Sequence, residues 1–278
     1  MTFTKEKDSK DGMEILTNFL YQMLFTVVVV VVLGLLIALC RRAFCAIVGK
    51  NGSKILLTTG IIGTPIHELS HALMCLIFGH KINKIKLYDP KSENGTLGYV
   101  AHSYNRKNPY HQIGNFFIGT APILCGSGVL LLLMALLIPE TNETIAAELR
   151  SIGFSANDFG EYFGSFWRII AALFDFSNMI DLRWWIFLVL AFSISTHMEL
   201  SPADVRGSLI GALFIAVLLL AIDAILYVIS LSALEAVTAA LASFSIYVVG
   251  FLAISGIFSL LMVAFALIIK GIVKLVRR

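Results

Sequence analysis

Six long apolar runs constrain the fold of this chain more than any other feature. They cover residues 16–40, 55–78, 113–138, 184–196, 205–230 and 239–269, the fourth being the shortest. A helix of about 20 apolar residues crosses a bilayer, and inside lipid the backbone satisfies its hydrogen bonds only in helices or closed barrels. Because 58% of the residues are hydrophobic and 14% are charged, we expect an all-α polytopic membrane protein with about six transmembrane helices.

A more polar stretch after the second run predicts a small β element. Residues 82–88 alternate apolar and polar side chains, and Asn94 and Gly95 separate them from a second short stretch at 97–102. This pattern is typical of a β-hairpin, which we expect at the membrane surface. We expect one membrane-embedded domain over residues 1–278, with a core at about 55–220. Residues 1–54 then form an N-terminal tail and first span, and residues 221–278 form the C-terminal spans.

The basic residues predict an orientation. If the N-terminus lies inside, Lys and Arg divide 14 to 7 between the inner and outer sides. The positive-inside rule then places both termini in the cytoplasm, and we expect a bacterial cytoplasmic membrane. The count assumes that residues 184–230 cross twice, and a re-entrant first half would change it. A net charge of only +3 gives no support for a nucleic-acid partner.

The second apolar run contains the motif HELSH at residues 67–71. Side chains at positions i and i+4 share one face of a helix, so His67 and His71 can bind one Zn²⁺ while Glu68 acts on a bound water. Ionisable residues inside a membrane helix are costly, which favours a functional role. The alternative is that the three side chains are polar groups that hydrogen-bond between packed helices.

A catalytic zinc usually has three protein ligands, so a third donor is expected elsewhere in the chain. The candidates are His197, Glu199 and Asp204, which lie around the break between the fourth and fifth apolar runs. Pro202 disfavours helix at the residue before it and suits the first turn of a helix, so Asp204 is expected in the first turn of a new helix. Such an aspartate either complements the helix dipole at the surface or, deeper in the bilayer, binds the metal.

The four cysteines, Cys40, Cys45, Cys75 and Cys125, form no CxxC pair. We interpret them as small apolar packing residues. Cys75 follows His71 by four residues and shares its helical face, where packing is favoured over a role as a fourth metal ligand.

Three motifs together resemble the site-2 protease family of intramembrane zinc metalloproteases. They are HELSH at residues 67–71, GTAPILCG at 119–126 and PADVRG at 202–207. The resemblance covers about residues 55–220 and is that of a divergent, short member without a PDZ domain. It implies that His67, His71 and Asp204 bind Zn²⁺, that Glu68 is the general base, and that the hairpin is the family's membrane-surface β element.

The third motif departs from the family pattern, because Ala203-Asp204-Val205 stands where the family has Leu-Asp-Gly. His197 precedes Asp204 by seven residues, close to two helical turns, so both would face the site in a helix that Pro202 did not interrupt. His197 is therefore either a residue that positions substrate or donates a hydrogen bond in the transition state, or a polar residue that lines the site. The resemblance suggests a substrate-positioning role for Pro122 in the second motif.

The sequence therefore predicts an intramembrane zinc metalloprotease that hydrolyses peptide bonds of membrane-spanning or membrane-associated substrates. Two alternatives remain open. In a membrane zincin of the CAAX-protease or heat-shock type, a downstream glutamate such as Glu199 is the third ligand, although Pro202 breaks the helix that this motif needs. In a non-proteolytic scaffold or transporter, the ionisable groups line a substrate path. No feature of the sequence indicates an oligomeric state.

Overall fold

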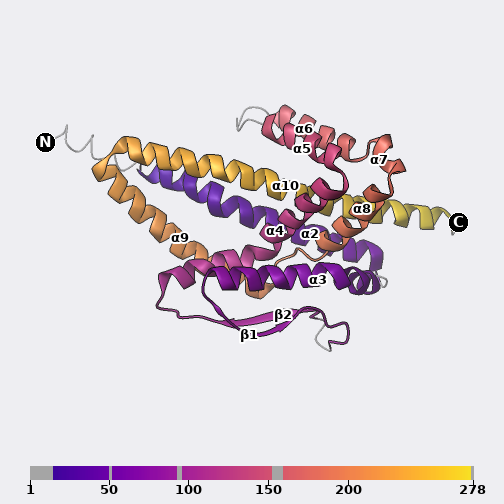
Figure 1. Cartoon of the computed structure of the whole chain (residues 1–278), viewed down its shortest axis with the longest axis horizontal. Helices are drawn as coiled ribbons and strands as arrows, with labels where there is room; N and C mark the ends of the chain where they lie inside the picture. The colour runs from indigo at the N-terminus through magenta and orange to yellow at the C-terminus, as the bar shows by residue number, and fades with distance from the viewer. Residues whose placement is uncertain (1–14, 50–51, 93–95, 152–158, 277–278) are drawn as a thin grey trace.

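The computed structural model describes residues 15–49, 52–92, 96–151 and 159–276 (Figure 1). It is an elongated bundle of helices with a small β-hairpin along one side, which confirms the predicted all-α polytopic class. The elements, in chain order, are η1 (Leu24–Val28), α2 (Val29–Val48), α3 (Gly52–Ile77), β1 (Lys81–Lys86), β2 (Tyr99–Ser103), α4 (Pro109–Leu137), α5 (Pro139–Ser151), α6 (Phe159–Leu173), α7 (Phe176–Ile180), α8 (Leu182–Ser195), α9 (Pro202–Ile229) and α10 (Leu231–Val276).

Within the described residues, five helical segments are long and apolar enough to cross a membrane: Ile15–Val48, Gly52–Ile77, Pro109–Leu137, Pro202–Ile229 and Leu252–Leu275. The sequence predicted about six, and the difference lies at residues 184–196. Helix α8 has 14 residues, which gives it a length of about 21 Å against a hydrocarbon core of about 30 Å. Helix α8 is therefore too short to be a separate span.

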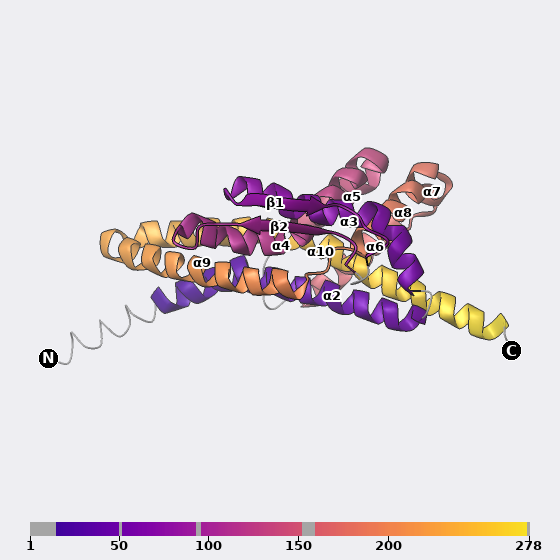
Figure 2. The same cartoon turned by 90° about the horizontal axis from the view of Figure 1, so that it is seen from below.

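Helices α8 and α9 together make one interrupted passage. In Figures 1 and 2 they follow one another along the long axis in the same direction, joined by the linker at residues 196–201. The linker extends the path of the chain without reversing it, which favours one crossing for residues 184–230 over the two that the count of basic residues assumed. The physical cause is Pro202, which ends the extended linker and begins a new helix.

This single passage changes the expected topology. The two ends of the described chain lie at opposite ends of the long axis (Figures 1 and 2). Both termini on the cytoplasmic side would require an even number of crossings, and their location stays a prediction. The 14-to-7 division of basic residues no longer applies, since it assumed two crossings in residues 184–230.

The predicted β-hairpin is present, as a two-stranded antiparallel sheet of β1 and β2 in the described part of the chain. Ile82 pairs with His102 and Ile85 with Val100, with an irregularity between Ile82 and Lys84. The sheet lies along helix α3, and both strands contact that helix (Figure 1). The hairpin thus follows the helix that carries the HELSH motif.

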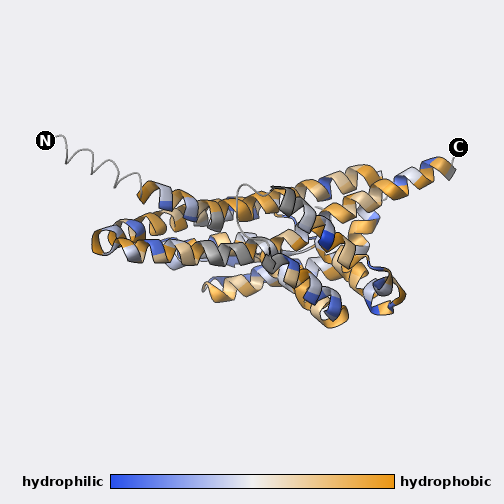
Figure 3. Ribbon diagram, turned by 90° about the horizontal axis from the view of Figure 1, so that it is seen from above, coloured by the Kyte–Doolittle hydropathy of each residue, from blue (hydrophilic) through white to orange (hydrophobic). Residues whose placement is uncertain are grey.

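Helix α4 is the central element, packing against α3, α8, α9 and α10. Apolar side chains such as Phe116, Leu130 and Phe187 are buried in the bundle, and many other large apolar side chains on the long helices are exposed. Figure 3 shows that hydrophobic residues predominate along these helices. An apolar exterior is what a lipid-facing bundle requires. Two polar pairs lie inside the bundle: Gln22 donates a hydrogen bond to Asp223, at 2.9 Å, and the Ser127 hydroxyl lies 2.6 Å from that of Ser255.

The interrupted α8–α9 passage predicts where reporter domains will be found. A topology reporter inserted at Thr144, in α5, and one fused after Arg278 should lie on the same side of the membrane, because α8, α9 and α10 together then cross twice. A reporter between α9 and α10, at Ser230, should lie on the opposite side and serves as the control. If the Thr144 and Arg278 reporters lie on opposite sides, residues 184–230 cross twice after all.

Candidate metal centre

The structure brings together three of the side chains that the sequence singled out. His67 and His71 lie on α3, and Asp204 lies in the first turn of α9. The two imidazole Nε2 atoms are 3.1 Å apart, and His71 Nε2 lies 3.5 Å from Asp204 Oδ1. A tetrahedral zinc with bonds of about 2.0–2.1 Å holds its ligand atoms about 3.3 Å apart. The donor atoms of His67, His71 and Asp204 could therefore hold one metal ion.

Backbone carbonyls fix the orientation of both imidazoles. His67 Nδ1 lies 2.6 Å from the carbonyl oxygen of His197, and His71 Nδ1 lies 2.7 Å from that of Ile118. A carbonyl only accepts, so each Nδ1 must carry the proton and donate. The lone pairs of both Nε2 atoms then face the same point. Metal-binding histidines are typically held in this way, by a hydrogen bond from the other ring nitrogen.

The Ile118 carbonyl is free to accept this hydrogen bond because of Pro122. In an α-helix the carbonyl of residue 118 would accept from the N–H of residue 122, and proline has none. Pro122 lies inside α4 and is buried. It is not among the described residues that line the cavity at the site. The second motif therefore orients the His71 ring through the Ile118 carbonyl. The sequence had instead suggested that Pro122 positions the substrate.

Asp204 uses its two carboxylate oxygens differently. Oδ2 accepts from the backbone N–H of Ser201 at 2.8 Å, while the Ser201 hydroxyl accepts from the Asp204 N–H at 3.2 Å, which forms a capping box at the start of α9. Oδ1 is left facing His71. The sequence offered helix capping and metal binding as alternatives, and the geometry allows one carboxylate to do both.

Gly119 lets the first turn of α9 come close to α4. A Cβ atom at this position would overlap the Asp204 carbonyl and the Ser208 side chain. Because α4 also supplies the Ile118 carbonyl that holds His71, this contact fixes the position of Asp204 relative to His71.

A cavity of about 400 Å³ opens beside these donors. Glu68 lines it and is only 6% exposed. Its lining includes residues of β2 and of the stretch just before it, such as Leu97, Gly98 and Val100, together with residues of α3 and of the 196–204 region. The cavity thus places a buried carboxylate, three candidate metal donors and a β-strand around one space.

His197 lies at the cavity, but its ring is held by other groups. Its Nε2 lies 3.0 Å from the Thr59 hydroxyl and its Nδ1 lies 3.4 Å from the Thr64 hydroxyl. Its backbone carbonyl is the part that reaches the metal centre, through His67. The predicted role of the His197 ring in positioning substrate stays a prediction.

Glu199 is paired with Arg41, which directly follows the first apolar run in the sequence. Helix α2 continues past Arg41 to Val48, so this guanidinium lies in the bundle and forms an ion pair with Glu199. Both side chains line the cavity. The Glu199 carboxylate therefore serves as the partner of Arg41 in this arrangement, and not as a metal ligand. In the sequence, two consecutive basic residues, Arg41 and Arg42, directly follow an apolar run, and no helix-ending residue lies between. This pattern was the signal that the helix continues through Arg41.

Cys75 does not join this centre, although it shares a helical face with His71. Its thiol instead lies with the imidazoles of His80 and His102. Burial lowers the pKa of the His80 and His102 imidazoles below the usual value for histidine.

Comparison of the chain with protein-family models, with curated proteins and with solved structures found no match.

Replacing Pro122 by Ala tests how the His71 ring is held. The new N–H at position 122 would compete for the Ile118 carbonyl, so zinc affinity should fall about 10–100-fold, as for other losses of a ligand's hydrogen-bond partner. Thermal stability should not fall, because the change adds a helical hydrogen bond. Zinc titration of the purified chain measures the effect.

Pro139→Ala, at the first residue of α5, is the control and should leave the affinity unchanged. Unchanged affinity in the Pro122 variant would mean that the His71 ring needs no help from this carbonyl.

Proposed function

We propose that this protein is an intramembrane zinc metalloprotease that cleaves membrane-spanning or membrane-associated polypeptides. The observation that carries the proposal is the pair of HELSH imidazoles, each held at Nδ1 by a carbonyl, with Asp204 Oδ1 beside them and Glu68 in the same cavity. Its setting is a helix long and apolar enough to cross a bilayer. We further propose a bacterial cytoplasmic membrane as its location.

The donor set favours zinc. Two imidazole nitrogens and one carboxylate oxygen are ligands that Zn²⁺ accepts, and Mg²⁺ and Ca²⁺ favour all-oxygen sites. Three protein ligands leave one position open, which distinguishes catalytic zinc sites from structural ones. When bound there, zinc would lower the pKa of a bound water and polarise the scissile carbonyl.

Glu68 is the proposed general base. Its position next to His67 on α3 turns it toward the cavity and leaves metal binding to the two histidines. In that place the carboxylate can take the proton of the attacking water and then deliver it to the leaving amine. Burial in a cavity between helices limits competing contact with bulk water.

Strand β2 is the proposed docking edge for the substrate. A transmembrane helix hides its amides in i to i−4 hydrogen bonds, so a substrate helix must unwind before cleavage. One edge of β2 pairs with β1, and residues of β2 line the cavity. An unwound segment that pairs with β2 would satisfy its backbone groups and bring an extended chain to Glu68.

The Glu-liganded alternative is less well supported by the geometry. Glu199 forms an ion pair with Arg41, and Asp204 Oδ1 faces His71. An arginine inside a bundle needs an anionic partner, and Glu199 supplies it.

Substitution of Glu68 separates chemistry from metal binding. Glu68→Gln should leave bound zinc near its wild-type amount and lower cleavage of a membrane-spanning substrate by about 10²–10⁴-fold, because it removes the base. His67→Ala should lose both. Zinc per chain and cleavage in proteoliposomes are the two measurements. Cleavage at the wild-type rate by the Gln variant would refute the assignment of the base.

Substitution of Asp204 and Glu199 identifies the third ligand. Asp204→Ala should lose zinc and cleavage together, since it removes one of three ligands. The matched variant Glu199→Gln should keep zinc but lower stability, by at most about 3–5 kcal/mol, because Arg41 loses its partner. Zinc content and thermal unfolding of both purified variants give the answer, and the reverse pattern would assign the protein to the Glu-liganded class.

A further inference from the structure

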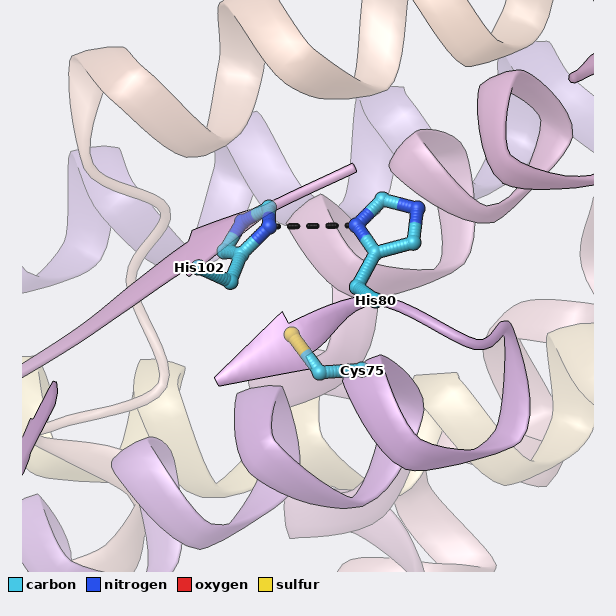
Figure 4. A group of neighbouring side chains, drawn as sticks. All are labelled: Cys75, His80 and His102. Atoms are coloured by element: carbon cyan, nitrogen blue, oxygen red, sulfur yellow. Dashed lines mark hydrogen bonds between the residues drawn. The ribbon is translucent and has the colours of Figure 1, made fainter. Parts of the chain in front are cut away.

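A second group of side chains that could hold a metal ion lies at the C-terminal end of α3, beginning one turn after the HELSH motif. Figure 4 shows Cys75, His80 and His102 turned toward one another. Their ligand atoms all lie within 4.8 Å of one another. Cys75 and His80 are buried, with exposed fractions of 0% and 3%, and His102 is half-buried. Thiolate and imidazole are the donors that structural zinc sites use.

The turn that ends α3 brings Cys75 and His80 together. Gly79 has φ +68°, the left-handed conformation that closes many helices. The His80 N–H donates to the Cys75 carbonyl at 2.8 Å, and the Gly79 N–H donates to that of Leu76 at 3.3 Å. These are the two hydrogen bonds of a Schellman motif. The backbone of His80 is therefore fixed next to that of Cys75 by the end of the helix itself.

The sheet supplies the third side chain. β1 begins at Lys81, directly after His80, and the antiparallel register pairs Ile82 with His102. His80 Nδ1 and His102 Nδ1 face each other at 3.1 Å, close to the separation of about 3.3 Å between two ligands of one zinc ion.

Neighbouring groups fix the orientation of the His80 ring, as they do for the two histidines of the HELSH motif. His80 Nε2 lies 2.9 Å from the backbone carbonyl of His111, so Nε2 carries the proton and Nδ1 presents its lone pair. Tyr104 stacks on the same ring, with centroids 4.6 Å apart, and fixes its plane. The His111 ring is engaged elsewhere, since its Nδ1 accepts from the Asn105 N–H.

We propose that Cys75, His80 and His102 form a second zinc site, which anchors the β-hairpin to the C-terminal end of α3. The thiol loses its proton when the metal binds, and water completes the four ligands. The site joins a helix end, the start of β1 and the middle of β2, so it fixes the strand that lines the cavity relative to the helix that carries Glu68.

Cobalt gives a test that is independent of catalysis. Co²⁺ replaces Zn²⁺ in such sites, and a thiolate bound to Co²⁺ absorbs by charge transfer in the near ultraviolet. His67, His71 and Asp204 include no sulfur, so only the second site can give this band. The detergent-solubilised full-length chain, stripped of metal and loaded with Co²⁺, should show it. The band should persist in His67→Ala and Cys125→Ala and vanish in Cys75→Ala.

Metal content gives the second measurement. Wild-type chain should bind two Zn²⁺, whereas His102→Ala and His67→Ala should each bind one, and the double variant should bind none. His111→Ala keeps the backbone carbonyl that holds His80 and should still bind two. Absence of the cobalt band in the wild-type chain, or its persistence in Cys75→Ala, would overturn the proposal. Neither result bears on the Glu68 and Asp204 variants, so the second site can fail while the protease assignment stands.

Discussion

The candidate metal centre depends on two backbone carbonyls that are free of the usual hydrogen bond from a helical N–H. In a bundle built for lipid, nearly every carbonyl accepts from an N–H of its own helix, and an unused one is costly. This chain frees the Ile118 carbonyl by placing Pro122 one turn later, and it frees the His197 carbonyl by ending α8 before that residue. The costs of both interruptions are offset because each carbonyl accepts from an imidazole. The direction of both Nε2 lone pairs follows from these two irregularities.

The same interruptions connect the centre to the rest of the bundle. The linker at residues 196–201 supplies the carbonyl for His67 and also ends in the capping box that turns Asp204 Oδ1 toward His71. Helix α4 supplies the carbonyl for His71 and, at Gly119, the surface against which the first turn of α9 packs. Helices α3, α4 and α9 and the linker at residues 196–201 thus all contribute contacts that hold the candidate metal centre.

Features set by local sequence could be predicted, and features set by pairing between distant segments could not. Apolar length and turn residues predicted the membrane class, the hairpin, and a helix that restarts at Pro202 with Asp204 in its first turn. The direction of α8 relative to α9 depends on how the whole bundle packs, so the sequence did not predict that these two helices follow one another in the same direction. The ion pair of Arg41 with Glu199 and the grouping of Cys75 with two histidines join residues far apart in the chain. The sequence indicated neither grouping, and it led us to interpret Cys75 as a packing residue.

The break between α8 and α9 also bears on how the protein is made. Helix α8 is too short to be held in a bilayer by itself, so its stable insertion must wait for α9 to emerge from the ribosome. His67 and His71 enter the membrane much earlier, on α3, but Asp204 and the His197 carbonyl come only with this later passage. A nascent chain therefore carries two imidazoles without their third partner until more than 200 residues have been translated. The order of biosynthesis keeps the centre incomplete while the rest of the bundle is still being assembled.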